Sequence, residues 1–152
     1  MHFLSWNVNG IRAAHRKGFL EWFKDTSPDI LCLQETKAWR EQLSEDLLEV
    51  PGYYSYFSQP ERKGYSGVAV YSTDRPQKVN TSFGDTRFDA EGRLLELVFD
   101  KFRLYNIYFP NGKASKERLQ YKMDFYYSFL ESLKPLIEQE KKIIICGDVN
   151  TA

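Results

Sequence analysis

The chain has 152 residues, of which 42% are hydrophobic and 16% aromatic, and this composition excludes a disordered chain and supports one compact domain with a core. Lys plus Arg and Asp plus Glu both number 21, so the net charge of zero excludes a generally basic surface, and any nucleic-acid-binding face must be local. No apolar segment approaches the roughly 18 residues that a membrane span requires, and we expect no membrane partner and a cytoplasmic location.

Apolar periodicity alternates between strands and helices, with no internal repeat, linker or low-complexity tract. In chain order it predicts a strand over residues 1–6, a helix around 19–23, a strand over 29–33, a helix around 43–48, strands over 53–57, 67–71, 93–99 and 102–109, a helix from about 115 to 133, and a strand over 143–146. Elements interleaved in this way indicate an α/β fold.

Three of these elements carry more specific expectations. Only Asp100-Lys101 joins residues 93–99 to residues 102–109, so these two strands should pair antiparallel. Pro135 should kink or end the long helix, because proline lacks the backbone N–H that a helix needs. The run 143–146 consists mainly of β-branched residues and predicts a buried strand.

The two cysteines lie inside apolar runs, and the basic residues form two local clusters. We expect Cys32 and Cys146 to be buried, non-catalytic thiols in a reducing compartment, and His2 and His15 to have strand or surface roles. Each basic cluster is open to two interpretations, a nucleic-acid-facing patch or, more commonly, a solvated loop or helix face. The clusters are Arg12, Arg16 and Lys17, and Lys113, Lys116 and Arg118.

Four predicted strands end in polar residues of types that bind metals or phosphates. In mixed α/β folds, ligands collect at strand ends because the scaffold fixes the loops there. Four such ends together are more informative than any one of them. The residues are Asn7, Glu35, Tyr108 with Asn111, and Asp148 with Asn150.

The chemistry that these residue types suit is hydrolysis of a phosphodiester with a hard divalent cation. Glu35 is the first choice of ligand, aided by the amide oxygen of Asn7, because Mg²⁺ prefers oxygen donors and keeps several waters. Asp148 would accept a proton from the attacking water or orient it. Asn150 and the Tyr108 hydroxyl would donate hydrogen bonds to the charge that grows on the phosphate, and no covalent nucleophile is required.

Each of these assignments also has a purely structural alternative. Asn7 and Asn150 suit turns, Tyr108 suits a strand, Asp148 suits a helix N-cap, and Glu35 suits a solvated surface. Taken singly, these alternatives are the more common, so the assignments depend on the residues occurring together.

Six short segments extend the pattern over the chain: Ser5–Arg12, Pro28–Lys37, Gly64–Ala69, Glu91–Arg93, Asn106–Gly112 and Gly147–Asn150. Together they resemble the exonuclease III and apurinic/apyrimidinic endonuclease family within the endonuclease/exonuclease/phosphatase superfamily. The Gln-Glu-Thr-Lys and Tyr-x-Pro-Asn-Gly segments separate this repair branch from the phosphoinositide phosphatase, sphingomyelinase and deadenylase branches. One four-residue match would be weak evidence, but six in order are strong.

The resemblance implies a deoxyribonuclease I-like four-layer sandwich, in which two mostly antiparallel sheets pack together with helices outside them, and of which residues 1–152 form the N-terminal part of a single domain. It implies a Mg²⁺ site, with Mn²⁺ as an alternative metal, formed by Glu35, Asn7, Asp148 and Asn150. It implies catalytic roles for Tyr108, Asp148 and Asn150. The positions that it assigns to a DNA-binding face are Asn9, Arg12, Tyr65, Arg93 and Asn111.

The family cleaves the DNA backbone 5′ to an abasic site, and many members also remove nucleotides or blocking groups from 3′ ends. The resemblance therefore implies a monomeric DNA repair nuclease whose partner is double-stranded DNA with abasic sites or 3′ ends. Two alternatives remain open: a non-catalytic DNA-binding or split-protein half and, with less support, a phosphatase or phospholipid diesterase of the same superfamily.

One departure from the family pattern concerns the C-terminal portion. The family's catalytic histidine, its aspartate partner and a further metal-site aspartate come from a portion that these residues do not contain. We accordingly expect truncation near Ala152, uncovered edges on the second sheet, and little or no activity from the chain by itself.

Overall fold

The computed structural model describes residues 1–82 and 84–151, so Ala152 lies outside the described residues, and within them two four-stranded sheets pack together. The first sheet has the strand order β1 (Phe3–Asn7), β2 (Ile30–Gln34), β4 (Val68–Ser72) and β3 (Tyr54–Ser58). The second has the order β5 (Lys78–Asn80), β6 (Leu94–Val98), β7 (Arg103–Tyr108) and β8 (Ile143–Asp148). The helices are α1 (Ile11–Arg16), α2 (Phe19–Thr26), α3 (Glu45–Leu48), α4 (Thr86–Asp89) and α5 (Lys116–Glu138), with a 3₁₀ turn over Arg40–Gln42.

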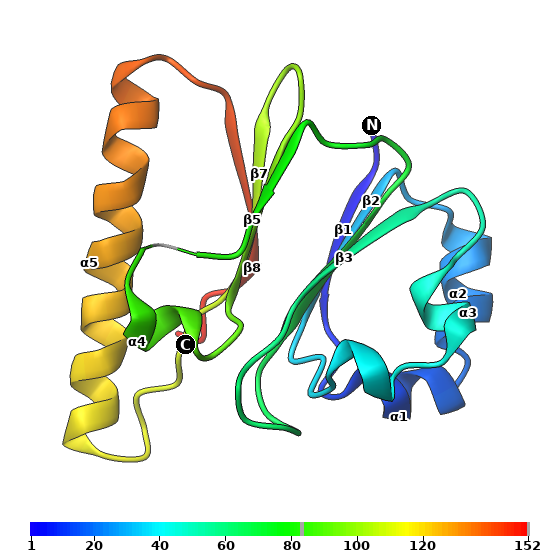
Figure 1. Cartoon of the computed structure of the whole chain (residues 1–152), viewed down its shortest axis with the longest axis horizontal. Coiled ribbons are helices and arrows are strands. Elements are labelled where there is room, and N and C mark those ends of the chain that lie inside the picture. The colour runs from blue at the N-terminus through cyan, green and yellow to red at the C-terminus, as the bar shows by residue number, and fades with distance from the viewer. Residues whose placement is uncertain (83, 152) are drawn as a thin grey trace.

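Most strand pairs in both sheets are antiparallel, as predicted. β1 pairs with β2 and β7 pairs with β8 in parallel, whereas the remaining pairs are antiparallel, including the predicted hairpin of β6 and β7. Figure 1 shows α1 to α3 outside the first sheet, and α4 and α5 outside the second. This arrangement confirms the predicted four-layer sandwich.

The core lies between the two sheets and beneath the helices on either side. In β2, Ile30 and Cys32 pack between the sheets, whereas Leu31 and Leu33 pack on the outer face, where Phe19 of α2 covers them. Buried side chains of α5 cover the outer face of the second sheet in the same way. They are Phe125, Phe129 and Leu133. Each such side chain contributes about 1.5–3 kcal/mol to folding when it is fully buried.

The strand β8 is not the buried strand that its composition predicts. It forms an edge of the second sheet with β7 as its neighbour, and Ile145 is 49% exposed. The prediction was wrong because an apolar run indicates a strand, whereas burial depends on whether neighbouring elements cover it on all sides.

The helix α5 continues past Pro135, so the expected end at this proline is wrong, whereas a kink there stays a prediction. It begins after Ser115, as predicted, and ends at Glu138. Proline removes one backbone hydrogen bond, but here it lies in the last turn, where Leu136 still packs against the core. Although α5 is long, no helix in the described ranges is long and apolar enough to cross a membrane.

Four short elements of the described residues were not predicted: α1, α4, β5 and the 3₁₀ turn over Arg40–Gln42. Tertiary contacts and caps define them, because elements of this length have little stability of their own. Ile11 of α1 is fully buried, and Asp85 caps α4 by accepting a hydrogen bond from the Arg87 backbone nitrogen at 3.0 Å. These elements lie in segments that show no apolar periodicity of their own.

The two cysteines lie in strands that face each other across the sandwich. Cys32 in β2 is fully buried, as predicted, whereas Cys146 in the edge strand β8 is only partly buried, contrary to the prediction. The neighbouring Cys146 sulfur, together with burial, raises the pKa of the Cys32 thiol well above its ordinary value.

Gly147 lies near the end of β8, where this strand approaches β7. Its φ of +149° falls in a region that favours glycine, and a Cβ atom there would lie 2.0 Å from the backbone oxygen of Ile107. No other residue fits without separating the strands. The contact fixes the backbone immediately before Asp148.

Candidate active site

Four strand ends meet at one end of the sandwich. Asn7 ends β1, Glu35 follows β2, Tyr108 ends β7 and Asp148 ends β8. The Asn7 Nδ2 atom lies 3.1 Å from Glu35 Oε1 and 2.8 Å from Asp148 Oδ2. The Tyr108 hydroxyl donates to Glu35 Oε1 at 2.7 Å. The fold thus brings both carboxylates and the tyrosine into one network, across 141 positions of sequence between Asn7 and Asp148.

Asn7 joins the two carboxylates through its amide nitrogen. Its amide oxygen points the other way and accepts a hydrogen bond from the Asn9 backbone nitrogen at 3.0 Å. The sequence interpretation directed that oxygen toward a metal. In the structure, Asn7 instead acts as a donor that holds Glu35 and Asp148 at a fixed separation.

Glu35 is ionised in its surroundings. Burial acts to raise its pKa, but hydrogen bonds from Tyr108 and Asn7 and the charge of Lys37 outweigh burial, so the pKa lies below its ordinary value of 4.5. Lys37 Nζ lies 3.4 Å from Glu35 Oε2 and donates to Asn9 Oδ1 at 2.6 Å. Sequence reasoning assigned Lys37 no role, although it ends the Gln-Glu-Thr-Lys segment.

Tyr108 is held in its protonated form. Burial and the hydrogen bond to Glu35 both raise the pKa of its hydroxyl well above the ordinary value. Its ring lies beneath the guanidinium of Arg93, whose carbon is 4.9 Å from the ring centroid. The hydroxyl is therefore a fixed hydrogen-bond donor at neutral pH.

Asp148 and Asn150 form a second part of the network. The Asn150 backbone nitrogen donates to Asp148 Oδ1 at 2.8 Å, and its side-chain nitrogen donates to the Phe109 carbonyl at 3.1 Å. Lys122 of α5 donates to the Asn150 carbonyl at 2.7 Å, a contact that was not predicted from the sequence. These bonds tie the loop after β8 to both β7 and α5.

Four residues around this network have left-handed backbone conformations. The φ angles are 45° at Asn9, 50° at Glu35, 53° at Lys37 and 52° at Asn150. Such conformations are uncommon for residues other than glycine, and they cluster at functional sites. Here they turn the chain sharply where each strand ends.

Three of the residues predicted to face DNA line one hollow beside this network, with a volume of about 510 Å³. These are Tyr65, Arg93 and Asn111, and Tyr108 forms part of the same wall. Lys113 and Arg118, from the second basic cluster, also line it. The hollow therefore joins positive charge to the carboxylate network.

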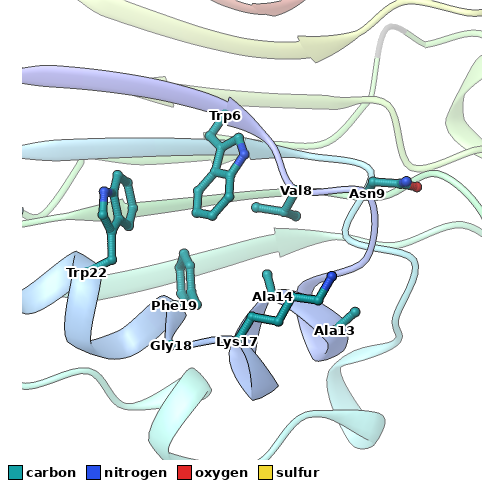
Figure 2. Close-up of a pocket in the computed structure, with 9 residues that line it drawn as sticks. All are labelled: Trp6, Val8, Asn9, Ala13, Ala14, Lys17, Gly18, Phe19 and Trp22. Atoms are coloured by element: carbon teal, nitrogen blue, oxygen red, sulfur yellow. The ribbon is translucent and has the colours of Figure 1, made fainter.

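The other two predicted DNA-facing residues, Asn9 and Arg12, contact Lys37. Arg12 of α1 donates to the Lys37 carbonyl at 3.1 Å. Asn9 lines a separate hollow of about 450 Å³, in which Figure 2 shows Asn9 and Lys17 toward one end and aromatic side chains toward the other. The aromatic residues are Trp6, Phe19 and Trp22.

The histidines lie outside the carboxylate network. His15 lies on α1 and approaches Asp46 Oδ2 at 3.2 Å, which is a surface contact as predicted. His2 directly precedes β1. Residues 1–82 and 84–151 contain no cluster of three or more His, Cys, Asp or Glu side chains placed to hold a metal ion. Glu35 and Asp148 are thus a pair of carboxylates rather than a complete ligand set.

Comparison with protein families settles the relationship that these segments suggest. Residues 4–152 match the model of the Endonuclease/Exonuclease/phosphatase family. The chain belongs to this family. Its relatives in the Endonuclease/Exonuclease/phosphatase family include an exodeoxyribonuclease of Bacillus subtilis (strain 168), 39% identical over all of this chain and 59% of the relative. The DNA repair nuclease APEX1 of Danio rerio is 38% identical over all of this chain and 49% of that protein.

Solved structures of the family share the fold. An AP endonuclease from Archaeoglobus fulgidus superposes with a TM-score of 0.84 at 31% identity, over 98% of this chain and 57% of that one. A 3′-5′ exonuclease from Neisseria meningitidis gives 0.87 at 27% identity, over 100% of this chain and 59% of that one. The resemblance to exonuclease III and abasic-site endonucleases is confirmed, and the chain spans roughly half to three fifths of these relatives.

Proposed function

We propose that this chain carries the metal-binding and phosphate-binding part of a Mg²⁺-dependent DNA repair nuclease that hydrolyses the phosphodiester 5′ to abasic sites and also acts on 3′ ends. The observation that carries the proposal is the convergence of Glu35, Asp148, Asn7 and Tyr108 in one hydrogen-bonded network. Relatives named exodeoxyribonuclease and DNA repair nuclease support it. A monomeric state and a cytoplasmic location stay predictions.

The donor set fits a hard divalent cation. Glu35 and Asp148 offer carboxylate oxygens a short distance from the Asn7 amide, and sulfur and imidazole ligands are absent from the described network. Mg²⁺ prefers oxygen ligands and retains waters that a phosphate can displace, so two carboxylates suffice as protein ligands. When bound, Mg²⁺ or Mn²⁺ supplies positive charge that offsets the charge of the phosphate.

The remaining residues of the network have roles that follow from their hydrogen bonds. Tyr108, held protonated, would turn its single hydroxyl hydrogen from Glu35 to a phosphate oxygen as negative charge grows there. Asp148 orients the attacking water or accepts its proton, and Asn7 and Asn150 keep its carboxylate in place. Asn150 lies beside Tyr108 through its bond to Phe109 and assists at the phosphate.

DNA would contact residues around the network. Arg93, Tyr65 and Asn111 line the hollow beside Tyr108, and Asn9 and Arg12 contact Lys37. Guanidinium and amide groups arranged in this way suit the phosphates of a duplex backbone. A solved relative described as a 3′ phosphatase bound to a product DNA hairpin supports action at 3′ ends.

A fusion of this chain to the part of the Bacillus subtilis relative that it does not span tests the proposal. With a duplex that contains one abasic-site analogue, we expect incision that requires Mg²⁺ or Mn²⁺ and stops with chelator. Glu35→Gln should lower the rate by at least about 10²-fold, because loss of a residue that only orients a metal ligand already costs about 10–100-fold. Glu41→Gln, at an exposed carboxylate of the 3₁₀ turn, is the matched control and should leave the rate unchanged.

Incision that is independent of divalent metal, or equal rates for Glu35→Gln and Glu41→Gln, would refute the proposal. Hydrolysis of a phosphoinositide or sphingomyelin in preference to DNA would favour the phosphatase or phospholipid diesterase alternative.

A second candidate function has its own support. Because the chain spans only 49–59% of the relatives' lengths, a non-catalytic DNA-binding or split-protein half is the alternative. The 152-residue chain by itself would then bind duplex DNA in a salt-sensitive manner without cleaving it. Incision by this chain alone, with Mg²⁺ present, would exclude the non-catalytic alternative.

A further inference from the structure

One carboxylate outside the proposed metal site lies between two arginines of the DNA-facing hollow. Glu91 Oε2 is 3.2 Å from Arg93 Nε, and Glu91 Oε1 is 3.1 Å from a terminal nitrogen of Arg118. The Tyr65 hydroxyl donates to the same Oε1 at 3.0 Å. Glu91 thus contacts three residues that come from separate segments of the chain.

Arg93 needs a negative partner because it is buried. Its side chain is only 3% exposed, and an uncompensated charge in such a place is costly. Its guanidinium also donates to the Tyr65 hydroxyl at 2.7 Å and to the Tyr108 carbonyl at 3.1 Å. Burial acts to raise the pKa of Glu91, but the charge of Arg93 and hydrogen bonds outweigh it, so Glu91 stays ionised.

Arg118 is held from a different direction. It lies in the first turn of α5, is 31% exposed, and donates to the Tyr65 hydroxyl at 3.1 Å. Its guanidinium carbon lies 4.3 Å from the centroid of the Tyr121 ring. Without Glu91, its long side chain would keep the tyrosine contacts but lose its charged partner.

The hollow keeps an excess of positive charge. Arg93, Arg118 and Lys113 line it, whereas Glu91 lines an adjoining hollow of about 380 Å³, which it shares with Arg118. One carboxylate against three cationic side chains leaves charge for an incoming anion. Fixed guanidinium groups lose less conformational entropy on binding than free ones do.

We propose that Glu91 is a positioning residue that holds Arg93 and Arg118 in the orientation that receives a DNA phosphate. The inference rests on the proposed function, since it assumes that DNA occupies the hollow. It extends to the metal site, because Arg93 holds Tyr108, whose hydroxyl bonds Glu35. Glu91 itself touches neither the phosphate nor the reacting atoms.

The proposal and simple electrostatics predict opposite results for Glu91→Gln. Removing a negative charge beside a phosphate site should tighten DNA binding if charge alone matters. Loss of positioning should weaken it, because Arg118 is then held by its tyrosine contacts alone and Arg93 loses its charged partner. The sign of the change therefore distinguishes a positioning role from a background charge.

The experiment measures binding of the 152-residue chain to a duplex with one abasic-site analogue by fluorescence anisotropy, with chelator present and at several salt concentrations. We expect Glu91→Gln to raise Kd by about 10-fold, as for one lost charge-assisted contact. The slope of log Kd against log salt should become shallower by about 0.9, as for one lost phosphate contact. Glu91→Asp keeps the charge but has a shorter side chain. Its Kd should lie between that of the unsubstituted chain and that of Glu91→Gln.

Glu61→Gln is the matched control. Glu61 lines the same adjoining hollow as Glu91 but forms no ion pair in the part of the chain that the structure describes. Its removal deletes the same charge without freeing either arginine. We expect an unchanged or slightly tighter Kd and an unchanged salt slope.

Several outcomes would overturn the inference. If Glu91→Gln binds as tightly as Glu61→Gln and its salt slope is unchanged, Glu91 has no positioning role, and the proposed function still stands. Failure of the unsubstituted chain to bind the duplex overturns the inference, because DNA then does not occupy the hollow, whereas incision by the fusion protein tests the proposed function separately. Circular dichroism checks each variant, and if Glu91→Gln does not fold, wild-type affinity and slope in Glu91→Asp overturn the inference.

Discussion

Two short apolar strands lead to the two carboxylates of the site, and they differ in burial. β2 is central in its sheet, and every one of its residues is buried before the chain reaches Glu35. β8 is an edge strand, and none of its residues is fully buried before the chain reaches Asp148. The two strands look alike in sequence, so composition indicates a strand, whereas sheet position decides how firmly the strand is held.

The largest expected difference between these strands concerns their cysteines. Cys146 in β8 should react with an aromatic disulfide reagent in the native protein, since it is only partly buried. Cys32 in β2 should react only through unfolding, so its protection should approach the full stability, typically about 5–15 kcal/mol. Mass spectrometry of the labelled protein identifies which thiol reacts first. Equal rates at the two cysteines would contradict the comparison.

Truncation of one apolar side chain in each strand should give a smaller difference. Leu33→Ala in β2 should lower the free energy of unfolding by about 3 kcal/mol, because it leaves a cavity at a fully buried position. Ile145→Ala in β8 should lower it by less than about 1 kcal/mol, because that side chain is half exposed. Equilibrium urea unfolding of both variants measures the two changes. A loss at Ile145 that matches the loss at Leu33 would show that β8 is covered in solution.

The smallest expected effect is the acid sensitivity that Glu35 contributes. Since the folded state lowers its pKa below 4.5, the ionised carboxylate stabilises the protein above that pH, and the contribution is lost as pH falls through the lowered pKa. The stability difference between the wild-type protein and Glu35→Gln should therefore be larger at pH 7 than near pH 3. Urea unfolding at both pH values tests this, and a constant difference would contradict the lowered pKa.

Much of the fold was predictable because its strands are apolar and its turns are polar. The hairpin of β6 and β7 follows from the short connection around Asp100-Lys101, and the start of α5 follows from Ser115. The exposure of β8 was not predictable, because its place at the edge of the sheet, among the described strands, does not depend on the strand's own sequence. The continuation of α5 past Pro135 depends on packing of its last turn, which local propensity cannot supply.

The site was predictable as a set of residues but not as a set of contacts. Glu35, Asp148 and Tyr108 stand at strand ends, and their types indicate phosphate chemistry. The direction of the Asn7 amide depends on Asn9 and on both carboxylates, so only coordinates could give it. The contacts of Lys122, Lys37 and Glu91 could not be predicted either. Lys122 and Glu91 have partners distant in sequence, and the contact of Lys37 with Glu35 depends on the turn between them.

The approach of β8 to β7 at Gly147 has a consequence for the direction of Asp148. The missing side chain at Gly147 lets the two backbones touch at Ile107, and the very next residue carries a carboxylate of the site. Gly147 has no side chain to react, but it determines where the Asp148 carboxylate lies. In the fusion protein, a library that randomises codon 147 should retain incision activity with glycine alone. Many substitutions at the solvent-facing Ile145 should leave that activity intact.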